Sequence, residues 1–154
     1  MQATVRSIYR SHVNPHLAQM LASLDLDKHY VKGEGAWLFD ENARRYVDFV
    51  AGFGALPFGH GADAIYRAAH EYLASGQPSL VQPSALGPAS RLAQKLVQIS
   101  PPGLEYVWFA NSGAEAVEAA LKACRAATQR AGVIYANSSF HGKTLGALSA
   151  TGAA

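Results

Sequence analysis

The chain has 154 residues, of which 49% are hydrophobic and 16% charged, so it carries enough apolar side chains for one globular domain and no compositional sign of disorder. Its 13 basic and 11 acidic residues are scattered rather than clustered, which predicts no nucleic-acid partner and no anionic-membrane partner. No window approaches the ~20 apolar residues of a membrane span, and the charged N-terminus lacks the apolar core of a signal peptide. We therefore expect a soluble, cytoplasmic protein.

The first half of the chain combines helical patterns with a hairpin pattern. Apolar residues at helical spacing predict one short lead-in helix within the first thirty residues: Leu17, Met20, Leu21 and Leu24. Two runs rich in aromatic and β-branched residues, 36–39 and 45–50, predict a β-hairpin whose turn places Asn42 in the left-handed conformation. The glycine-rich stretch 52–61 predicts a loop of unusual backbone shape.

Two more helices are predicted in the middle of the chain. The first ends at Gly76 and has an apolar face made of Ile65, Ala68, Ala69, Tyr72 and Leu73. The second covers about residues 89–99 and ends at Pro101-Pro102-Gly103. Its apolar residues Leu92, Leu96 and Ile99 are expected to point inward.

The segment from 106 to 136 has the pattern strand, helix, strand. Apolar runs at 106–110 and 133–136 flank an alanine-rich helical pattern at 113–127. Such a unit predicts a right-handed crossover that joins two parallel strands, and hence the α/β class. Because one crossover does not complete an open parallel sheet, we expect an incomplete sheet. The remaining residues predict a loop that enters a small-residue helix.

The single cysteine, Cys124, lies within this predicted helix. It cannot form an internal disulfide, which suits a reducing compartment. It falls on the apolar-leaning side of the helix, and no base is placed beside it in the sequence. We therefore expect a buried small hydrophobic residue rather than a nucleophile.

The junction between the first apolar run and the helix has two possible meanings. Ser112 and Glu115 form a capping-box pattern, and Glu118 and Lys122 are spaced for an exposed ion pair. These features are typical of any well-formed helix. However, Gly113 and Ala114 have almost no side chain to exclude a ligand, so the amides of the first turn could also hold a phosphate. The residues alone leave both interpretations open.

The loop 137–144 is expected at the same sheet edge as this junction, where α/β proteins bind ligands. In it, Phe140 either stacks on a planar ligand or folds into the core, and His141 is expected to be a hydrogen-bonded loop residue. Gly142-Lys143-Thr144 also matches the second half of a P-loop, although Asn137 replaces the first glycine. A nucleotide-binding module is therefore an alternative function.

Four stretches resemble, in order and spacing, the class III aminotransferases, which are pyridoxal-phosphate enzymes of fold type I: GAWLFDENARRYVDFVAGFG, GHG, NSGAEAVEAALKACRAAT and SSFHGKTLGALSATG. The resemblance extends from about Tyr30 to the end of the sequence. It implies that residues 1–60 form an N-terminal segment with the lead-in helix, the hairpin and the glycine-rich loop. Residues 61–154 would then begin the large α/β/α domain that binds pyridoxal 5'-phosphate, with an incomplete mixed sheet.

The resemblance also implies roles for individual residues. Ser112, Gly113 and Ala114 match the turn that holds the cofactor phosphate. Phe140 matches the aromatic residue that stacks on the pyridine ring, and His141 and Gly142 match the rest of that loop. The implied reaction moves an amino group from an amine donor to an oxo acid or aldehyde. No metal is implied.

Two further expectations concern the substrate and the catalytic lysine. Lys143 occupies a substrate-contact position that is often arginine in acetylornithine-type members, which favours diamines and other ω-amines as donors. The Schiff-base lysine of the family lies beyond the matching segment, so the 154 residues alone are expected to be inactive. A non-catalytic structural fragment is the third hypothesis.

The resemblance further predicts a homodimer. In the family the active site lies at the subunit boundary. The stretches 52–61 and 77–88 are long and apolar, and a single subunit would leave them half covered. A dimer would cover both stretches.

Overall fold

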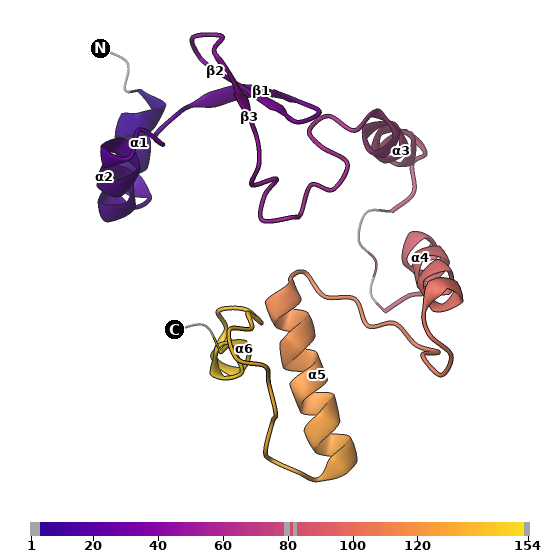
Figure 1. Cartoon of the computed structure of the whole chain (residues 1–154). Helices are drawn as coiled ribbons and strands as arrows, with labels where there is room; N and C mark the ends of the chain where they lie inside the picture. The colour runs from indigo at the N-terminus through magenta and orange to yellow at the C-terminus, as the bar shows by residue number, and fades with distance from the viewer. Residues whose placement is uncertain (1–3, 79–80, 82, 153–154) are drawn as a thin grey trace. The chain divides into compact units, whose positions relative to one another are not determined.

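The computed structural model describes residues 4–78, 81 and 83–152. Its contacts divide the chain into two compact units, residues 1–79 and 80–154, which are drawn from indigo to pink and from pink to yellow in Figure 1. The predicted domain boundary near residue 60 remains a prediction. No helix among the described residues is both long and apolar enough to cross a membrane, and no group of metal-ligating side chains occurs among them.

Helix α2 (Pro15–Ser23) confirms the lead-in helix that the sequence predicted, and a second helix, α1 (Val5–His12), precedes it. Helix α1 was not predicted, because most of its eight residues, VRSIYRSH, are polar. Asn14 caps α2, its Oδ1 accepting the Leu17 N–H at 2.9 Å, and Pro15 has no N–H to continue a helix from α1.

The sheet of the first unit is antiparallel, with three strands in the order β1 (Tyr30–Glu34), β2 (Trp37–Asp40) and β3 (Arg45–Val47). The predicted hairpin is confirmed as β2 and β3, whereas β1 was not predicted. Ala43, with φ 60°, takes the left-handed turn position that was expected for Asn42. Asn42 instead donates its N–H to Asp40 Oδ1 at 2.9 Å, so its backbone is held by an Asx turn.

Asp40 organises this hairpin. It is 3% exposed, and its carboxylate accepts hydrogen bonds from the Arg44 N–H at 2.9 Å and the Tyr46 hydroxyl at 3.0 Å in addition to the Asn42 N–H. Burial by itself would raise the pKa of Asp40, but these hydrogen bonds outweigh it and the pKa lies below its ordinary value. The charged carboxylate of Asp40 therefore accepts the hydrogen bonds that hold the turn.

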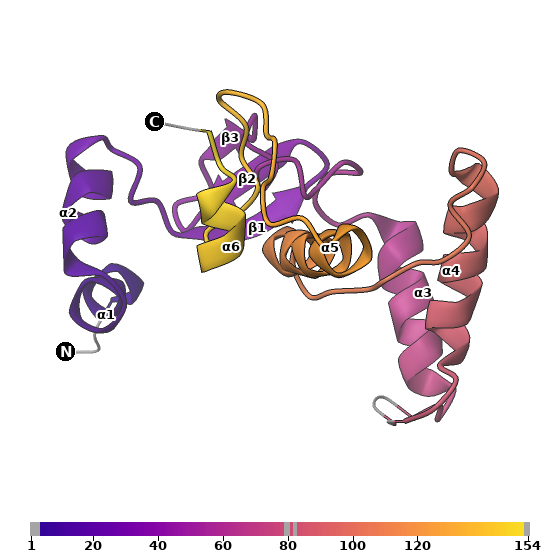
Figure 2. The ribbon, with the colours of Figure 1, turned by 90° about the horizontal axis from the view of Figure 1, so that it is seen from below.

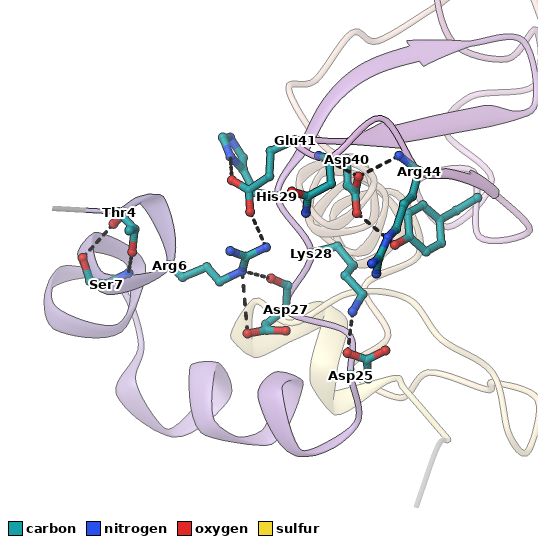
Figure 3. Close-up of polar contacts among 12 residues, drawn as sticks. Thr4, Arg6, Ser7, Asp25, Asp27, Lys28, His29, Asp40, Glu41 and Arg44 are labelled. Carbon is teal, nitrogen blue, oxygen red and sulfur yellow. Dashed lines mark hydrogen bonds and ion pairs between the residues drawn. The ribbon is translucent and has the colours of Figure 1, made fainter. Parts of the chain in front are cut away.

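Arg6 connects α1 to the turn of this hairpin, as Figure 3 shows. Its Nη2 lies 2.6 Å from Glu41 Oε1, and its Nε donates to the Asp27 carbonyl at 2.7 Å. His29 Nδ1 lies 3.2 Å from the other oxygen of Glu41. One arginine thus links α1 both to the segment before β1 and to the turn between β2 and β3.

The glycine-rich loop between β3 and α3 closes back on the turn between β1 and β2. Gly35 and His60 exchange two backbone hydrogen bonds of 2.9 and 2.8 Å. At Gly59, with φ 75°, a Cβ would lie 2.7 Å from the Gly35 carbonyl oxygen, so no larger residue fits there. Ala51 and Phe53 also have positive φ, which confirms the predicted unusual backbone.

Helices α3 (Asp63–Ala74) and α4 (Gly87–Ile99) confirm two further predictions. Gly76, with φ 68°, follows the end of α3 as expected. The predicted inward faces are not buried: Ile65 and Leu73 are exposed on α3, and so are Leu92 and Ile99 on α4. Within its own unit, neither helix packs against another helix or strand in the described part of the chain.

The second unit continues with α5 (Gly113–Thr128) and α6 (Leu145–Ser149), which confirms the predicted helices. The two parallel strands predicted at 106–110 and 133–136 are absent from the described residues. A strand requires hydrogen-bonding neighbours, and no described segment pairs with either run. Tyr106 and Ile134 consequently stay exposed. Cys124 is also exposed, not buried as predicted, because no described element covers its side of α5.

Candidate functional site

The junction before α5 is built as a helix cap. Ser112 is the N-cap residue, and its Oγ accepts the Glu115 N–H at 3.2 Å. Glu115 Oε2 in turn accepts the N–H of Asn111 at 2.7 Å, not that of Ser112 as the capping-box pattern predicted. The reciprocal bond is thus shifted by one residue, and it fixes the chain just before the helix.

The first turn of α5 presents amides that the helix itself does not use. The first N–H groups of an α-helix have no acceptor in the preceding turn, and here Ser112 satisfies only that of Glu115. Gly113 is exposed, and a Cβ added to it would meet nothing within 4 Å, so the space beside this residue is open. The amides of Gly113 and Ala114 therefore form an accessible, positively polarised corner at the start of a 16-residue helix.

The loop 137–144 is closed at its base by hydrogen bonds with the segment that follows α6. Ser138 donates its N–H to the Gly152 carbonyl at 3.0 Å, and Gly152 donates back to the Ser139 carbonyl at 3.0 Å. The backbone N–H of His141 donates to Thr151 Oγ1 at 3.1 Å. Residues 138–152 therefore form one hydrogen-bonded loop around the short helix α6.

This loop lies directly against the start of α5, and α6 lies beside α5 in Figures 1 and 2. Gly142 has φ 130°, and a Cβ there would lie 2.6 Å from Ala114 Cβ and 3.2 Å from Ala147 Cβ. Only glycine permits this approach. The structure thus brings together the predicted phosphate corner, Ser112 to Ala114, and the predicted ring-stacking loop.

Glu118 makes a second connection between α5 and this loop. Its Oε1 accepts hydrogen bonds from Thr144 Oγ1 at 2.7 Å, the Gly146 N–H at 2.8 Å and the Ala147 N–H at 3.2 Å. The Thr144 hydroxyl foremost, with the two amides, lowers the pKa of Glu118 below its ordinary value. The predicted Glu118–Lys122 ion pair is not formed within the described chain.

The side chains that the sequence singled out differ in their exposure. Phe140 is 66% exposed, so it does not fold into the core. His141 is half-buried, and Lys143 is exposed. Sequence analysis missed Glu118 and Thr151 as residues that hold the loop, because their partners lie 9 to 29 residues away and follow no local spacing rule.

The loop geometry does not favour the P-loop alternative. In a P-loop the lysine and the Ser/Thr hydroxyl face the phosphates and magnesium. Here the Thr144 hydroxyl donates to the carboxylate of Glu118, and the Lys143 side chain is exposed. A carboxylate at this position would repel a triphosphate.

Comparison with known proteins identifies aminotransferases among the relatives of this chain. The family profile described as "Aminotransferase class-III" matches residues 22–154. An acetylornithine aminotransferase from Archaeoglobus fulgidus is 42% identical over 123 residues, which are 78% of this chain and 31% of that protein. The aminotransferase PigE from a Serratia species is 38% identical over 145 residues, covering 94% of this chain and 17% of that protein. The chain thus spans a third or less of the length of these relatives.

Solved structures give the same picture. An adenosylmethionine-8-amino-7-oxononanoate aminotransferase from Methanocaldococcus jannaschii matches with a TM-score of 0.81 and 28% identity, over 97% of this chain and 36% of that chain. A taurine:2-oxoglutarate aminotransferase from Bifidobacterium kashiwanohense, solved in complex with PLP and glutamate, matches with a TM-score of 0.81 and 29% identity. That match covers 99% of this chain and 34% of the solved one.

Proposed function

The chain belongs to the class III aminotransferases, and on that premise we propose that the protein carrying it transfers an amino group from an amine donor to an oxo acid or aldehyde with pyridoxal 5'-phosphate as cofactor. Residues 61–154 would begin the large cofactor-binding domain of fold type I. When bound, the cofactor withdraws electrons from the carbon that carries the amino group. The residues of this chain bind and orient it.

The observation that carries the proposal is the contact between Ala114 and Gly142. It places a helix start with open amides next to a loop that carries an exposed aromatic ring. We assign the phosphate to the amides of Gly113 and Ala114 and the hydroxyl of Ser112, and the face of the pyridine ring to Phe140. His141 and Gly142 complete the loop around the ring. The residues present therefore fit a ligand with one anionic and one planar end.

No catalytic residue is assigned within this chain. Lys28 is paired with Asp25, and Lys32 lies 2.6 Å from Glu34, so both are held in ion pairs of the first unit. Lys122 lies on α5 beyond Glu118, and Lys143 is exposed in the loop. We propose that Lys143 contacts the substrate. A lysine gives a point charge rather than the two-pronged grip of arginine on a carboxylate, which favours a diamine or other ω-amine donor.

We further propose that the protein is a homodimer in the cytoplasm. The glycine-rich loop exposes three aromatic side chains, with Phe49 93%, Phe53 99% and Phe58 75% exposed, and a second subunit would cover them. The stretch 77–88, predicted for the same role, lies partly outside the described residues. An exposed, unpaired Cys124 supports a reducing compartment. Light scattering tests the dimer, and a monomeric, active full-length protein would contradict it.

The experiment that tests the proposed function combines cofactor binding with an amino-transfer assay. The full-length protein, depleted of cofactor, is titrated with pyridoxal phosphate and followed by absorbance, and then supplied with putrescine and 2-oxoglutarate. We expect saturable binding and formation of glutamate. If the protein shows neither result but binds ATP tightly in a magnesium-dependent way, the nucleotide-binding alternative is supported. If it binds pyridoxal phosphate but transfers an amino group from none of the tested amines, the non-catalytic alternative is supported.

A further inference from the structure

Glu118 attaches the ring-stacking loop to α5 at a point separate from the Ala114–Gly142 contact. One oxygen, Oε1, receives a hydroxyl donor from the end of the loop and two amide donors from the start of α6. The fit is close, since a Cβ at Gly146 would overlap the carboxylate. The three donors lie 26 to 29 residues from Glu118 in sequence.

The two attachment points lie on one face of α5. Ala114 and Glu118 are four residues apart, which places them on successive turns of the same side of the helix. Gly142 rests on the first, and Thr144, Gly146 and Ala147 bond to the second. The hydrogen bonds that close residues 138–152 on themselves make this segment one unit. Two contacts along α5 fix the direction of that unit, and of Phe140 within it, relative to the helix.

We propose that Glu118 is a positioning residue whose carboxylate sets the orientation of Phe140 relative to the phosphate corner, and so controls binding of the cofactor ring. This inference rests on the proposed function. It separates two parts of the site: the corner, which Ser112 and α5 build without Glu118, and the ring platform, which depends on it.

The chemistry of the cluster requires a charged acceptor. Three donors converge on a single oxygen, and ionised acceptors form hydrogen bonds roughly twice as strong as neutral ones. The donors lower the pKa of Glu118, so the group stays ionised at neutral pH. A glutamine keeps an acceptor oxygen of the same reach without the charge, whereas an alanine removes the acceptor. Comparing the two substitutions therefore separates the contribution of the charge from that of the acceptor oxygen.

The test compares two ligands in the cofactor-free full-length protein: inorganic phosphate, which uses the corner alone, and pyridoxal phosphate, which also uses the ring platform. For Glu118→Ala we expect affinity for pyridoxal phosphate to fall by about tenfold or more, with an altered circular dichroism of the bound chromophore. Affinity for inorganic phosphate should stay within about twofold. Glu118→Gln should recover part of the loss, and Lys122→Ala, one turn further along α5, should match the wild type.

A second variant reaches the cluster from the other side. In Gly146→Ala the new methyl group displaces the carboxylate without removing it, so we expect the same selective loss of pyridoxal phosphate affinity. Because both changes break the same cluster, the double variant should bind pyridoxal phosphate no more weakly than the weaker-binding of the two single variants. This keeps the test informative if Glu118→Ala does not fold.

Three outcomes separate the inference from its premise. Unchanged affinity and dichroism in both variants would overturn the role of Glu118 while leaving the cofactor assignment intact. Equal losses for both ligands would also overturn it, because they would mean that Glu118 only stabilises α5. If the wild type binds no pyridoxal phosphate, the proposed function fails, and the inference about Glu118 fails with it. Amide exchange at Gly146 and Ala147 would in that case still show whether the Glu118 carboxylate holds the loop.

Discussion

His60 Nε2 lies 2.8 Å from Oδ2 of Asp48, across the base of the glycine-rich loop that both residues enclose. The other oxygen, Oδ1, accepts the N–H groups of Val50 at 2.9 Å and Ala51 at 2.8 Å. Asp48 therefore bonds both to the start of the loop and, through the imidazole, to its end. Gly33 leaves room for this ring, since a Cβ there would lie 2.8 Å from His60 Cγ.

We expect the loop between Asp48 and His60 to loosen in acid. The Ala51 N–H foremost, and then His60, lower the pKa of Asp48. A carboxyl group whose pKa is lower in the folded protein than in the unfolded chain stabilises the fold. This stabilisation is complete above the pKa of the unfolded chain, about 3.9, and is lost as the pH falls through the pKa of the folded protein. Amide exchange at Val50 and Ala51, followed by NMR as the pH is lowered, measures it.

Asp48→Asn should remove this pH dependence and raise the exchange rate of the Ala51 amide at neutral pH by about tenfold, because a neutral acceptor bonds more weakly. Glu71→Gln, on the exposed side of α3, is the matched control and should change neither. If acid loosens the loop equally in Asp48→Asn, Asp48 is not the group responsible.

Sequence rules predicted the elements that depend on neighbouring residues. The helix starting after Ser112 and the hairpin around residues 40–45 follow from capping and turn signals within a few positions. The rules failed where distant residues decide. Glu118 was assigned to Lys122 by the i,i+4 rule, but its partners are 26 to 29 residues away. The apolar run 106–110 was predicted as a strand, but pairing requires a neighbour that the described chain does not supply.

The two parts of the candidate site and their proximity were predictable, but the contact that joins them was not. The expected sheet edge and the motif resemblance both placed Ser112 to Ala114 near the loop that carries Phe140. That they lie in contact depends on Gly142 approaching Ala114, and neither residue carries a local signal for that approach. The exposed Cys124 shows the same limit, since the pattern of one helix does not reveal which neighbour covers it.

Gly142→Ala should separate the ring-stacking loop from the phosphate corner. The added methyl group would lie 2.6 Å from Ala114 Cβ, and a φ of 130° disfavours any residue with a Cβ. Overpacking of this kind costs about 1–3 kcal/mol, so we expect both lower stability and weaker binding of pyridoxal phosphate. Thermal unfolding and cofactor titration measure the two effects. Gly132→Ala, where a Cβ meets nothing within 4 Å, is the control and should be close to neutral.

Substitutions of Ser112 should separate helix capping from phosphate binding. Ser112→Ala loses the bond to the Glu115 N–H and should destabilise α5 by about 0.5–2 kcal/mol, with weaker phosphate binding. Ser112→Asp retains a capping oxygen, but its negative charge repels a phosphate at the same amides. We therefore expect the aspartate variant to keep near wild-type stability in urea unfolding and to lose phosphate affinity. Tight phosphate binding by Ser112→Asp would place the ligand elsewhere.

Lys143→Arg should shift the substrate preference of the full-length protein toward a carboxylate-bearing donor. The exposed lysine offers one charged point, whereas arginine offers two parallel N–H donors to a carboxylate. We expect kcat/KM for putrescine to exceed that for N-acetylornithine in the wild type, and the ratio to narrow by about tenfold in the variant. A wild-type preference for N-acetylornithine, or an unchanged ratio, would argue against substrate contact by Lys143.

The 154 residues by themselves should bind pyridoxal phosphate weakly and should not transfer amino groups. The corner and Phe140 would bind the phosphate and one face of the ring, but we assign none of the five lysines to a covalent bond with the cofactor. Two of them form ion pairs in the first unit. Lys95 lies on α4, Lys122 lies on α5, and Lys143 is exposed in the loop. Reduction with borohydride in the presence of pyridoxal phosphate, followed by mass spectrometry, identifies any labelled lysine. We expect scattered labelling well below one cofactor per chain, as for surface amines. One fully labelled lysine together with measurable amino transfer would show that this segment contains a complete active site.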